Sequence, residues 1–153
     1  MFSLTDKEIV PSKEVLESLD PRSGGLVFFE GRVRYHNEGH SVKSLEYQCY
    51  DEMAINEGEK IIKSAFTKFD IHSAKCIHRY GHLNIKDIAV WVAVGSSHRK
   101  EAFQACEYII DQVKCNVPIW KKEYYVDQKP VWVACHHCQS VSSDIIPLVS
   151  AEK

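Results

Sequence analysis

The chain has 153 residues, of which 44% are apolar and 26% are charged, as is typical of one globular domain. Its 19 basic and 21 acidic residues argue against a general nucleic-acid or membrane-surface binder, but they leave room for a local cationic pocket. The first ten residues lack the apolar core of a signal peptide, and the longest apolar run, residues 88–94, is too short to span a bilayer. We therefore expect a cytoplasmic protein.

The residue pattern in the first half of the chain predicts two helices and two strands. A helix is expected over residues 11–19, with Pro11 in its first turn, and strands are expected over residues 26–34 and 42–50. Residues 35–41 are polar, so we predict a mobile loop with no assigned role. Asp51 is the expected cap of a long amphipathic helix that continues to Phe69.

The second half predicts a buried strand, a helix and further strands. Residues 88–94 are apolar on both faces, which indicates a central strand covered on both sides. A strand is expected before it over residues 71–80. Ser96 or Ser97 is expected to cap a helix over residues 98–115, which Pro118 stops. Strands over residues 119–126 and 131–134 follow.

This mixture of hairpins and helical crossovers predicts one α+β domain with a largely antiparallel sheet. We expect that domain to cover residues 1–138 and residues 139–153 to form a flexible tail.

The first candidate site is the start of the helix at residues 98–115. His98, Arg99 and Lys100 lie where backbone N–H groups and the helix dipole already favour an anion. Cations are unfavourable at this end unless an anion offsets them, which suggests a phosphate or carboxylate ligand. The alternative is that a serine caps the helix and the basic side chains are solvated.

The second and third candidates are a lysine pair and an arginine pair. Lys114 and Lys121 flank Pro118 and could converge on one site, where neighbouring cations lower a lysine's pKa and improve it as a nucleophile or base. Arg32 and Arg34 share one face of a strand and could clamp an oxyanion. In both cases the alternative is ordinary exposed side chains.

The fourth candidate is Cys135-His136-His137-Cys138, which suggests zinc. Consecutive residues fit one tetrahedral ion poorly, and no second ligand pair follows at finger spacing, so we expect no metal. We expect Cys76 and His78 to be core and edge residues, and Cys106 and Cys115 to be packing positions of a helix.

Five stretches of the chain, in order and at the same spacing, resemble the large, catalytic subunit of molybdopterin synthase, the MoaE family. They are residues 25–34 (GLVFFEGRVR), 45–47 (LEY), 78–81 (HRYG), 96–99 (SSHR) and 118–123 (PIWKKE).

The resemblance implies an α/β hammerhead fold and an enzyme that inserts two sulfur atoms into cyclic pyranopterin monophosphate (precursor Z), forming the dithiolene of molybdopterin. It implies that the sulfur arrives as the C-terminal thiocarboxylate of a small ubiquitin-like subunit. It further implies a homodimer of large subunits within a heterotetramer, and no cofactor.

By position, the resemblance makes Lys114 and Lys121 the catalytic residues and Arg34, His98 and Arg99 the substrate-binding residues. It leaves open which protomer of a dimer supplies each of them. Two other readings compete with it: a non-catalytic module that holds a phosphorylated ligand or an acidic tail in its basic pocket, and a zinc hydrolase built on the Cys/His cluster.

Overall fold

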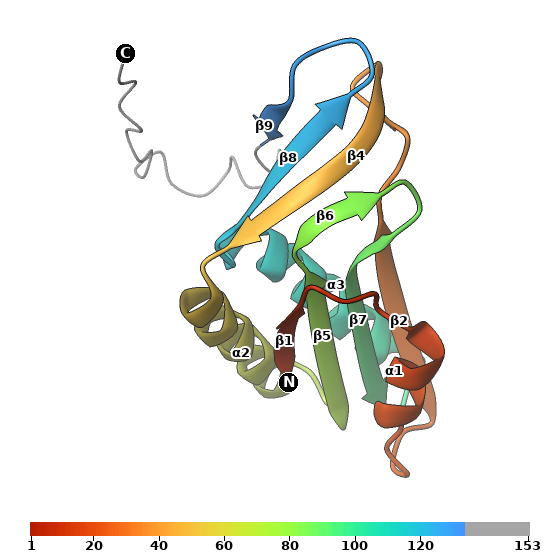
Figure 1. Ribbon diagram of the computed structural model, residues 1–153. Coiled ribbons are helices and arrows are strands. Elements are labelled where there is room, and N and C mark those ends of the chain that lie inside the picture. Colours follow the sequence, from red (N-terminus) through yellow and green to blue (C-terminus); the bar gives the residue numbers. More distant parts are fainter. Residues whose placement is uncertain (134–153) are drawn as a thin grey trace.

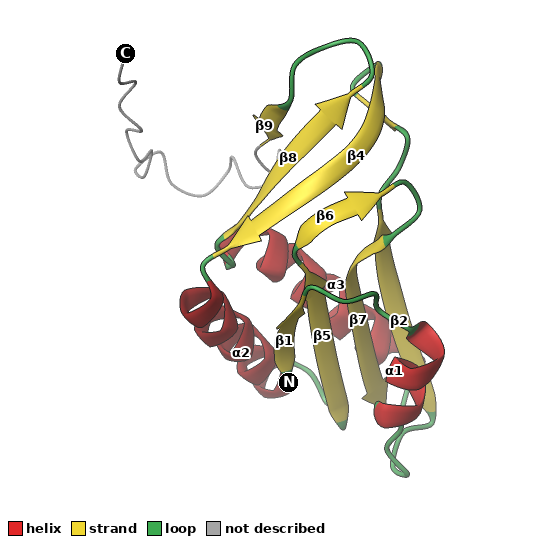
Figure 2. Ribbon diagram, viewed as in Figure 1, coloured by secondary structure: helices red, strands yellow, loops and turns green. Residues whose placement is uncertain are grey.

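The computed structural model describes residues 1–133, which form two sheets and three helices (Figures 1 and 2). The elements in chain order are β1 (Phe2–Thr5), α1 (Pro11–Glu17), β2 (Gly25–Arg32), β3 (His36–Asn37), β4 (His40–Cys49), α2 (Asp51–Lys68), β5 (Ser73–Arg79), β6 (Gly81–Asn84), β7 (Ile88–Ser96), α3 (Arg99–Asn116), β8 (Ile119–Tyr125) and β9 (Val131–Val133). Most predicted elements are present within two or three residues of their expected ends. No ranges were predicted for β1 and β6.

Strand β7 lies inside a four-stranded sheet of order β1-β5-β7-β2. It pairs antiparallel with both neighbours, so that Val92 lies opposite Cys76 on one side and Phe29 on the other. All nine residues of β7 are buried. This confirms the prediction that residues 88–94 form a central strand, because a strand covered on both faces needs apolar side chains on both.

Helices cover both faces of this sheet. In Figure 1, α1 lies on the near side, whereas α3 runs behind the strands and α2 lies beside it. The larger core joins α2 and α3 to alternate residues of β7, Val90, Val92 and Val94. Trp91 and Ala93 point the other way and pack beneath α1. The sheet is therefore the middle layer of three.

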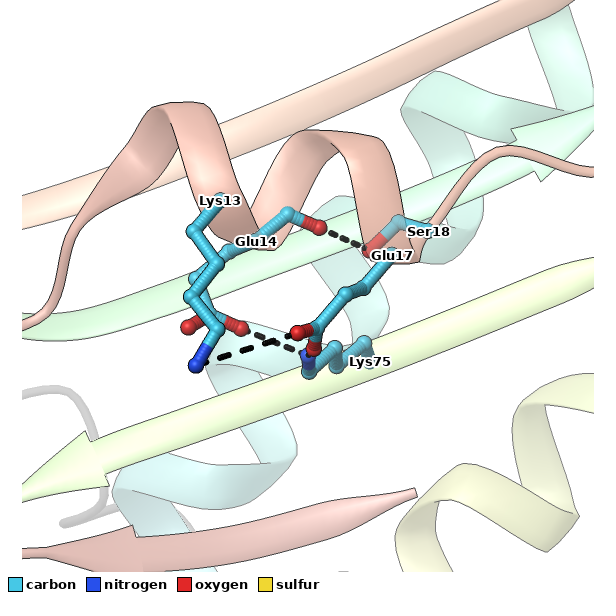
Figure 3. A network of polar contacts seen from close by, with 5 residues as sticks. All are labelled: Lys13, Glu14, Glu17, Ser18 and Lys75. Carbon is cyan, nitrogen blue, oxygen red and sulfur yellow. Dashed lines mark hydrogen bonds and ion pairs between the residues drawn. The ribbon is translucent and has the colours of Figure 1, made fainter.

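A buried lysine fastens α1 to the sheet. The Nζ of Lys75, on β5, lies 2.5 Å from Glu14 Oε2 and 2.7 Å from Glu17 Oε2 (Figure 3). Lys13 approaches Glu17 at 3.9 Å from the solvent side. Burial lowers the pKa of Lys75, but the hydrogen bonds and charges of the two glutamates outweigh it, so the pKa is raised overall.

The second sheet has the order β3-β4-β8-β9, with β6 also paired to β4. All its pairings are antiparallel, and its own small core includes Val42, Leu45 and Leu83. The chain passes from β5 into β6 at Gly81, whose φ of +84° lets the strand direction change sharply. The parallel pair β1–β5 is the exception among the described strands, so the predicted α+β class with mostly antiparallel sheets is confirmed.

Two expected helix caps are wrong. Helix α2 begins after Tyr50 and α3 begins after His98, and neither N-cap side chain makes a capping hydrogen bond. Ser96 instead pairs with Gly25 at the end of β7, and its Oγ donates to the carbonyl of His98. The strand thus continues two residues further than its apolar run, and this moves the start of α3.

Among the described residues, no helix has the length and apolarity needed to cross a membrane. The cluster at residues 135–138 and the expected tail at residues 139–153 lie outside the described residues.

Candidate active site

A cavity of about 390 Å³ lies where the two sheets meet the C-terminal end of α3. Its walls come from segments that are far apart in the sequence, including the end of β2, the hairpin β3–β4, β5, α3 and β8. A volume of this size suits a small organic ligand. Three of the five predicted site residues line it: Arg34, Lys114 and Lys121.

The two lysines reach the cavity from consecutive elements. Lys114 lies in the last turn of α3, which ends just before Pro118, and Lys121 lies on β8, which follows. The expectation that they face one site agrees with this placement. Lys122, next along β8, points away, and its Nζ lies 5.5 Å from the ring centroids of Tyr124 and Trp132.

Glu123 is a buried carboxylate beside these lysines, with only 2% of its surface exposed. Its Oε1 lies 2.8 Å from Lys121 Nζ, and its Oε2 accepts hydrogen bonds from Tyr125 Oη at 2.5 Å and Asn37 Nδ2 at 3.1 Å. Burial raises the pKa of Glu123, but the hydrogen bonds and the charge of Lys121 together outweigh this effect. The pKa is therefore lowered overall, and the carboxylate is held ionised. Glu123 thereby fixes the position of Lys121.

Arg34 joins the same network through a hairpin. Its Nη2 donates to Asn37 Oδ1 at 2.8 Å. Asn37 pairs with His40 across a two-residue turn, Glu38 and Gly39, both with positive φ. Residues 35–41 were expected to form a loop, but they contain strand β3, and the hairpin brings Asn37 to the cavity.

Arg32 also lines the cavity, but its guanidinium is engaged elsewhere. It pairs with Glu30 at 2.6 Å and donates to the carbonyl of Lys86 at 2.9 Å. Strand β2 ends at Arg32, so the alternation along the strand on which the predicted pairing of the two arginines rests does not extend to Arg34.

His78 and Tyr47 form a neutral part of the wall that the sequence analysis did not identify. His78 was expected at an edge, but it is buried, and its ring lies 5.1 Å from that of Tyr47. His78 Nδ1 lies 2.9 Å from the carbonyl oxygen of Arg79; a carbonyl only accepts, so Nδ1 carries the proton and Nε2 is an acceptor. Burial, then the charge of Lys114, lowers the pKa of His78 to about 4, despite the opposing bond to Arg79.

Tyr47 is also kept neutral. Burial, with the nearby charge of Glu123, raises its pKa to about 12. The alternation Leu45, Tyr47 along β4 could have indicated an inward face, but the pairing with His78 depends on how the two sheets meet.

His98 and Arg99 lie at the other end of α3, and both are exposed. Lys114 follows Arg99 by fifteen residues on one helix, which at a rise of roughly 1.5 Å per residue separates them by about 22 Å. A Cβ added to Gly25, at the start of β2, would lie 3.9 Å from the Cα of Arg99. Within one chain, these two residues therefore do not join the cavity.

The cysteines of the described residues take no part in the cavity. Cys76 and Cys106 are buried core residues, as expected, whereas Cys115 is exposed, so its prediction as a packing position is wrong.

The arrangement suits an anionic ligand. Arg34, Lys114 and Lys121 supply three cationic side chains, and Glu123 holds one of them in place. Lysine can donate a proton, accept one or attack a carbonyl carbon, and arginine can bind an oxyanion.

Comparison with known proteins identifies the family of this chain. Residues 4–116 match the family model described as MoaE protein. The molybdopterin synthase catalytic subunit of Pyrococcus abyssi is 44% identical over 111 residues, which are 72% of this chain and 74% of that protein.

Solved structures share the fold. Molybdopterin synthase from Staphylococcus aureus superposes with a TM-score of 0.81 at 34% identity, covering 86% of this chain and 96% of that one. A Helicobacter pylori chain from a complex of subunits 1 and 2 of molybdopterin-converting factor matches at a TM-score of 0.68 and 21% identity, covering 86% and 88%. The chain therefore belongs to the MoaE family, whose named relatives are catalytic subunits of molybdopterin synthase.

Proposed function

We propose that this chain is the catalytic subunit of a molybdopterin synthase. It transfers sulfur from the C-terminal thiocarboxylate of a small ubiquitin-like subunit to cyclic pyranopterin monophosphate, forming the dithiolene of molybdopterin in the cytoplasm. The observation that carries this proposal is the placement of Arg34, Lys114 and Lys121 around one cavity in a chain of the MoaE family.

The charges of the cavity match the two reactants. The pterin carries a cyclic phosphate, which the guanidinium of Arg34 can bind, and the thiocarboxylate is a second anion, which the lysines can hold beside the pterin. Lys114 serves as general acid/base or as nucleophile. Lys121, fixed by Glu123, positions the reactants and stabilises the charge that develops.

A second protomer supplies His98 and Arg99. The cavity lies at the C-terminal end of α3, where the helix dipole disfavours an anion, whereas His98 and Arg99 lie at the favourable end. Those two residues can serve the same cavity only if the N-terminal end of α3 comes from another copy.

Strand β2 offers a way to build that dimer. It lies at one edge of the four-stranded sheet, and Phe28 on it is 51% exposed. Its eight residues span about 23 Å from Gly25, beside Arg99, to Arg32, beside the cavity. Two β2 strands related antiparallel by a two-fold axis would bring Arg99 of each protomer to the cavity of the other.

The first test is reconstitution. The purified chain is mixed with thiocarboxylated small subunit and cyclic pyranopterin monophosphate, and formation of the dithiolene pterin is followed for the wild type and Lys114→Ala. We expect product from the wild type, and a rate at least about 100-fold lower from the variant.

Product from both proteins would support the proposed enzyme activity and show that Lys114 is not needed for it. If neither protein forms product although the small subunit binds, the chain is instead a binding module.

A further inference from the structure

Asn37 lies between the two functional parts of the cavity. Its Oδ1 accepts from Arg34 Nη2 at 2.8 Å, and its Nδ2 donates to Glu123 Oε2 at 3.1 Å. The other oxygen of Glu123 lies 2.8 Å from Lys121 Nζ. One continuous chain of polar contacts therefore runs from the arginine to the lysine.

The backbone holds Asn37 at this point. It pairs with His40 in the β3–β4 hairpin, and the amide of Val42 donates to the carbonyl of Tyr35 at 2.7 Å at the base of the same hairpin. The amide side chain is half-buried. Its bond to Glu123 lies where water competes less, because that carboxylate is only 2% exposed, whereas its bond to Arg34 is exposed.

We propose that Asn37 is a positioning residue that couples Arg34 to Lys121 through Glu123 in the folded protein. Its acceptor orients the guanidinium that binds the anion, and its donor orients the carboxylate that places the lysine. Asn37 can have this role only if Arg34 and Lys121 serve the sulfur transfer proposed above, so the proposal rests on that function.

An amide is the side chain that this place requires. It presents an acceptor to a guanidinium and a donor to a carboxylate at once, which no other uncharged side chain of this length can do. Aspartate keeps the acceptor for Arg34 but places a second negative charge against Glu123. Alanine removes both contacts. The two substitutions therefore separate the two arms of the network.

The kinetic test compares Asn37→Asp and Asn37→Ala in the reconstituted reaction. For Asn37→Asp we expect substrate affinity within about threefold of wild type and kcat lowered about tenfold, because only the Lys121 arm is disturbed. For Asn37→Ala we expect both kcat and substrate affinity to fall about tenfold. Asn84→Ala, an exposed asparagine on β6 away from the cavity, should match the wild type.

Wild-type kcat and affinity in Asn37→Ala would overturn the proposal. So would identical effects of the two substitutions on affinity, because Arg34 would then not depend on the acceptor.

A second measurement does not depend on the reaction. Arg34→Ala and Glu123→Gln are combined, and their unfolding equilibria are measured in urea with Asn37 present and in the Asn37→Ala background. We expect the effects to be coupled about tenfold with Asn37 present and to be additive in its absence. Additivity in both backgrounds would refute the coupling.

The two measurements separate the two proposals. Coupling in the unfolding cycle, together with a wild-type protein that forms no dithiolene, would overturn the proposed function and show that the contacts of Asn37 with Arg34 and Glu123 serve the fold alone. Dithiolene formation without coupling would support the proposed function and overturn the proposed role of Asn37.

Discussion

Burial and hydrogen bonding set the protonation state of individual side chains in the cavity. His78 and Tyr47 are neutral because burial disfavours their charged forms. Glu123 is charged because three donors surround it: Lys121, Tyr125 and Asn37. The cavity thus combines a cationic rim with a neutral wall. That wall can accept a hydrogen bond from an uncharged N–H or O–H of a ligand at His78 Nε2.

His78 gives the protein a definite dependence of stability on pH. Its pKa is about 4 in the folded chain against an ordinary 6.5, so between these values the unfolded chain binds a proton that the native chain does not. Its contribution to the free energy of unfolding is complete above pH 6.5 and is lost as the pH falls toward 4. Going from pH 7 to pH 5, we expect His78 to account for a loss of about 2 kcal/mol.

Urea unfolding of the wild type and His78→Gln at the two pH values measures this loss. The wild type should lose about 2 kcal/mol more than the variant on acidification. Equal losses would show that His78 is protonated in the folded protein as readily as in the unfolded one.

At the scale of helices and strands, an ion-pair cluster around Lys75 helps to hold α1 against the sheet. Lys75 and Glu14 have side chains only 11% and 13% exposed, whereas the contact of Lys13 with Glu17 is largely solvated. Removing Lys75 leaves the carboxylate of Glu14 without its partner in a place that water reaches poorly. An unpaired buried charge of this kind lowers the free energy of unfolding more than removal of both partners does.

We therefore expect Lys75→Met to lower the free energy of unfolding by about 2 kcal/mol, and Lys13→Met, the matched control on the same cluster, by less than about 0.5 kcal/mol. Denaturant titrations of both variants measure the difference. The double variant Lys75→Met with Glu14→Gln should recover part of the loss, because it removes the unpaired charge. Similar losses for the two lysines would mean that Lys75 is as well solvated as Lys13.

Helices and strands could be predicted from the sequence where the apolar residues recur with a clear helical or strand period. Residues 88–94 carry apolar side chains on both faces, and this alone identifies a central strand. Strand β6 has only four residues, of which Leu83 is the buried one, so no alternating pattern is long enough to detect. The sequence predicts a loop around Gly39, where the structure has a hairpin, because β3 has only two residues and its pairing with β4 depends on the turn conformation.

For the candidate site, the sequence predicted three residues that line one cavity, Arg34, Lys114 and Lys121, but not the distances between them. Lys114 and Lys121 are close in the sequence, so their convergence across Pro118 could be expected. Glu123 and Asn37 contribute through contacts that span the chain, which no local pattern reveals. Arg99 and Lys114 were grouped by resemblance, and only the length of α3 shows that they are far apart within one chain.

At the scale of the whole molecule, the proposed two-fold dimer predicts that inactive chains can restore each other. If Arg34 of one protomer and Arg99 of the other share a cavity, then in a mixed dimer of Arg34→Ala and Arg99→Ala one cavity carries both substitutions and the other carries neither. Random mixing makes half of the dimers mixed, so the activity should return to about a quarter of the wild-type value.

Refolding the two variants together and assaying dithiolene formation measures this recovery. Arg34→Ala mixed with Lys114→Ala is the control, because both residues line the cavity of one chain and no mixed dimer has an intact cavity. No recovery in the first mixture would place Arg99 outside the cavity altogether.

The contact between Asn37 and Glu123 joins residues that are 86 positions apart. It can form only after β4 has paired with β8, a long-range pairing that closes a large loop and is slow compared with helix formation. A chain in which α2 and α3 have formed without this pairing would have its helical content but no cavity, because β4 and β8 supply part of the cavity wall. The cavity therefore depends on this long-range pairing, and a partly folded chain that lacks the pairing lacks the cavity as well.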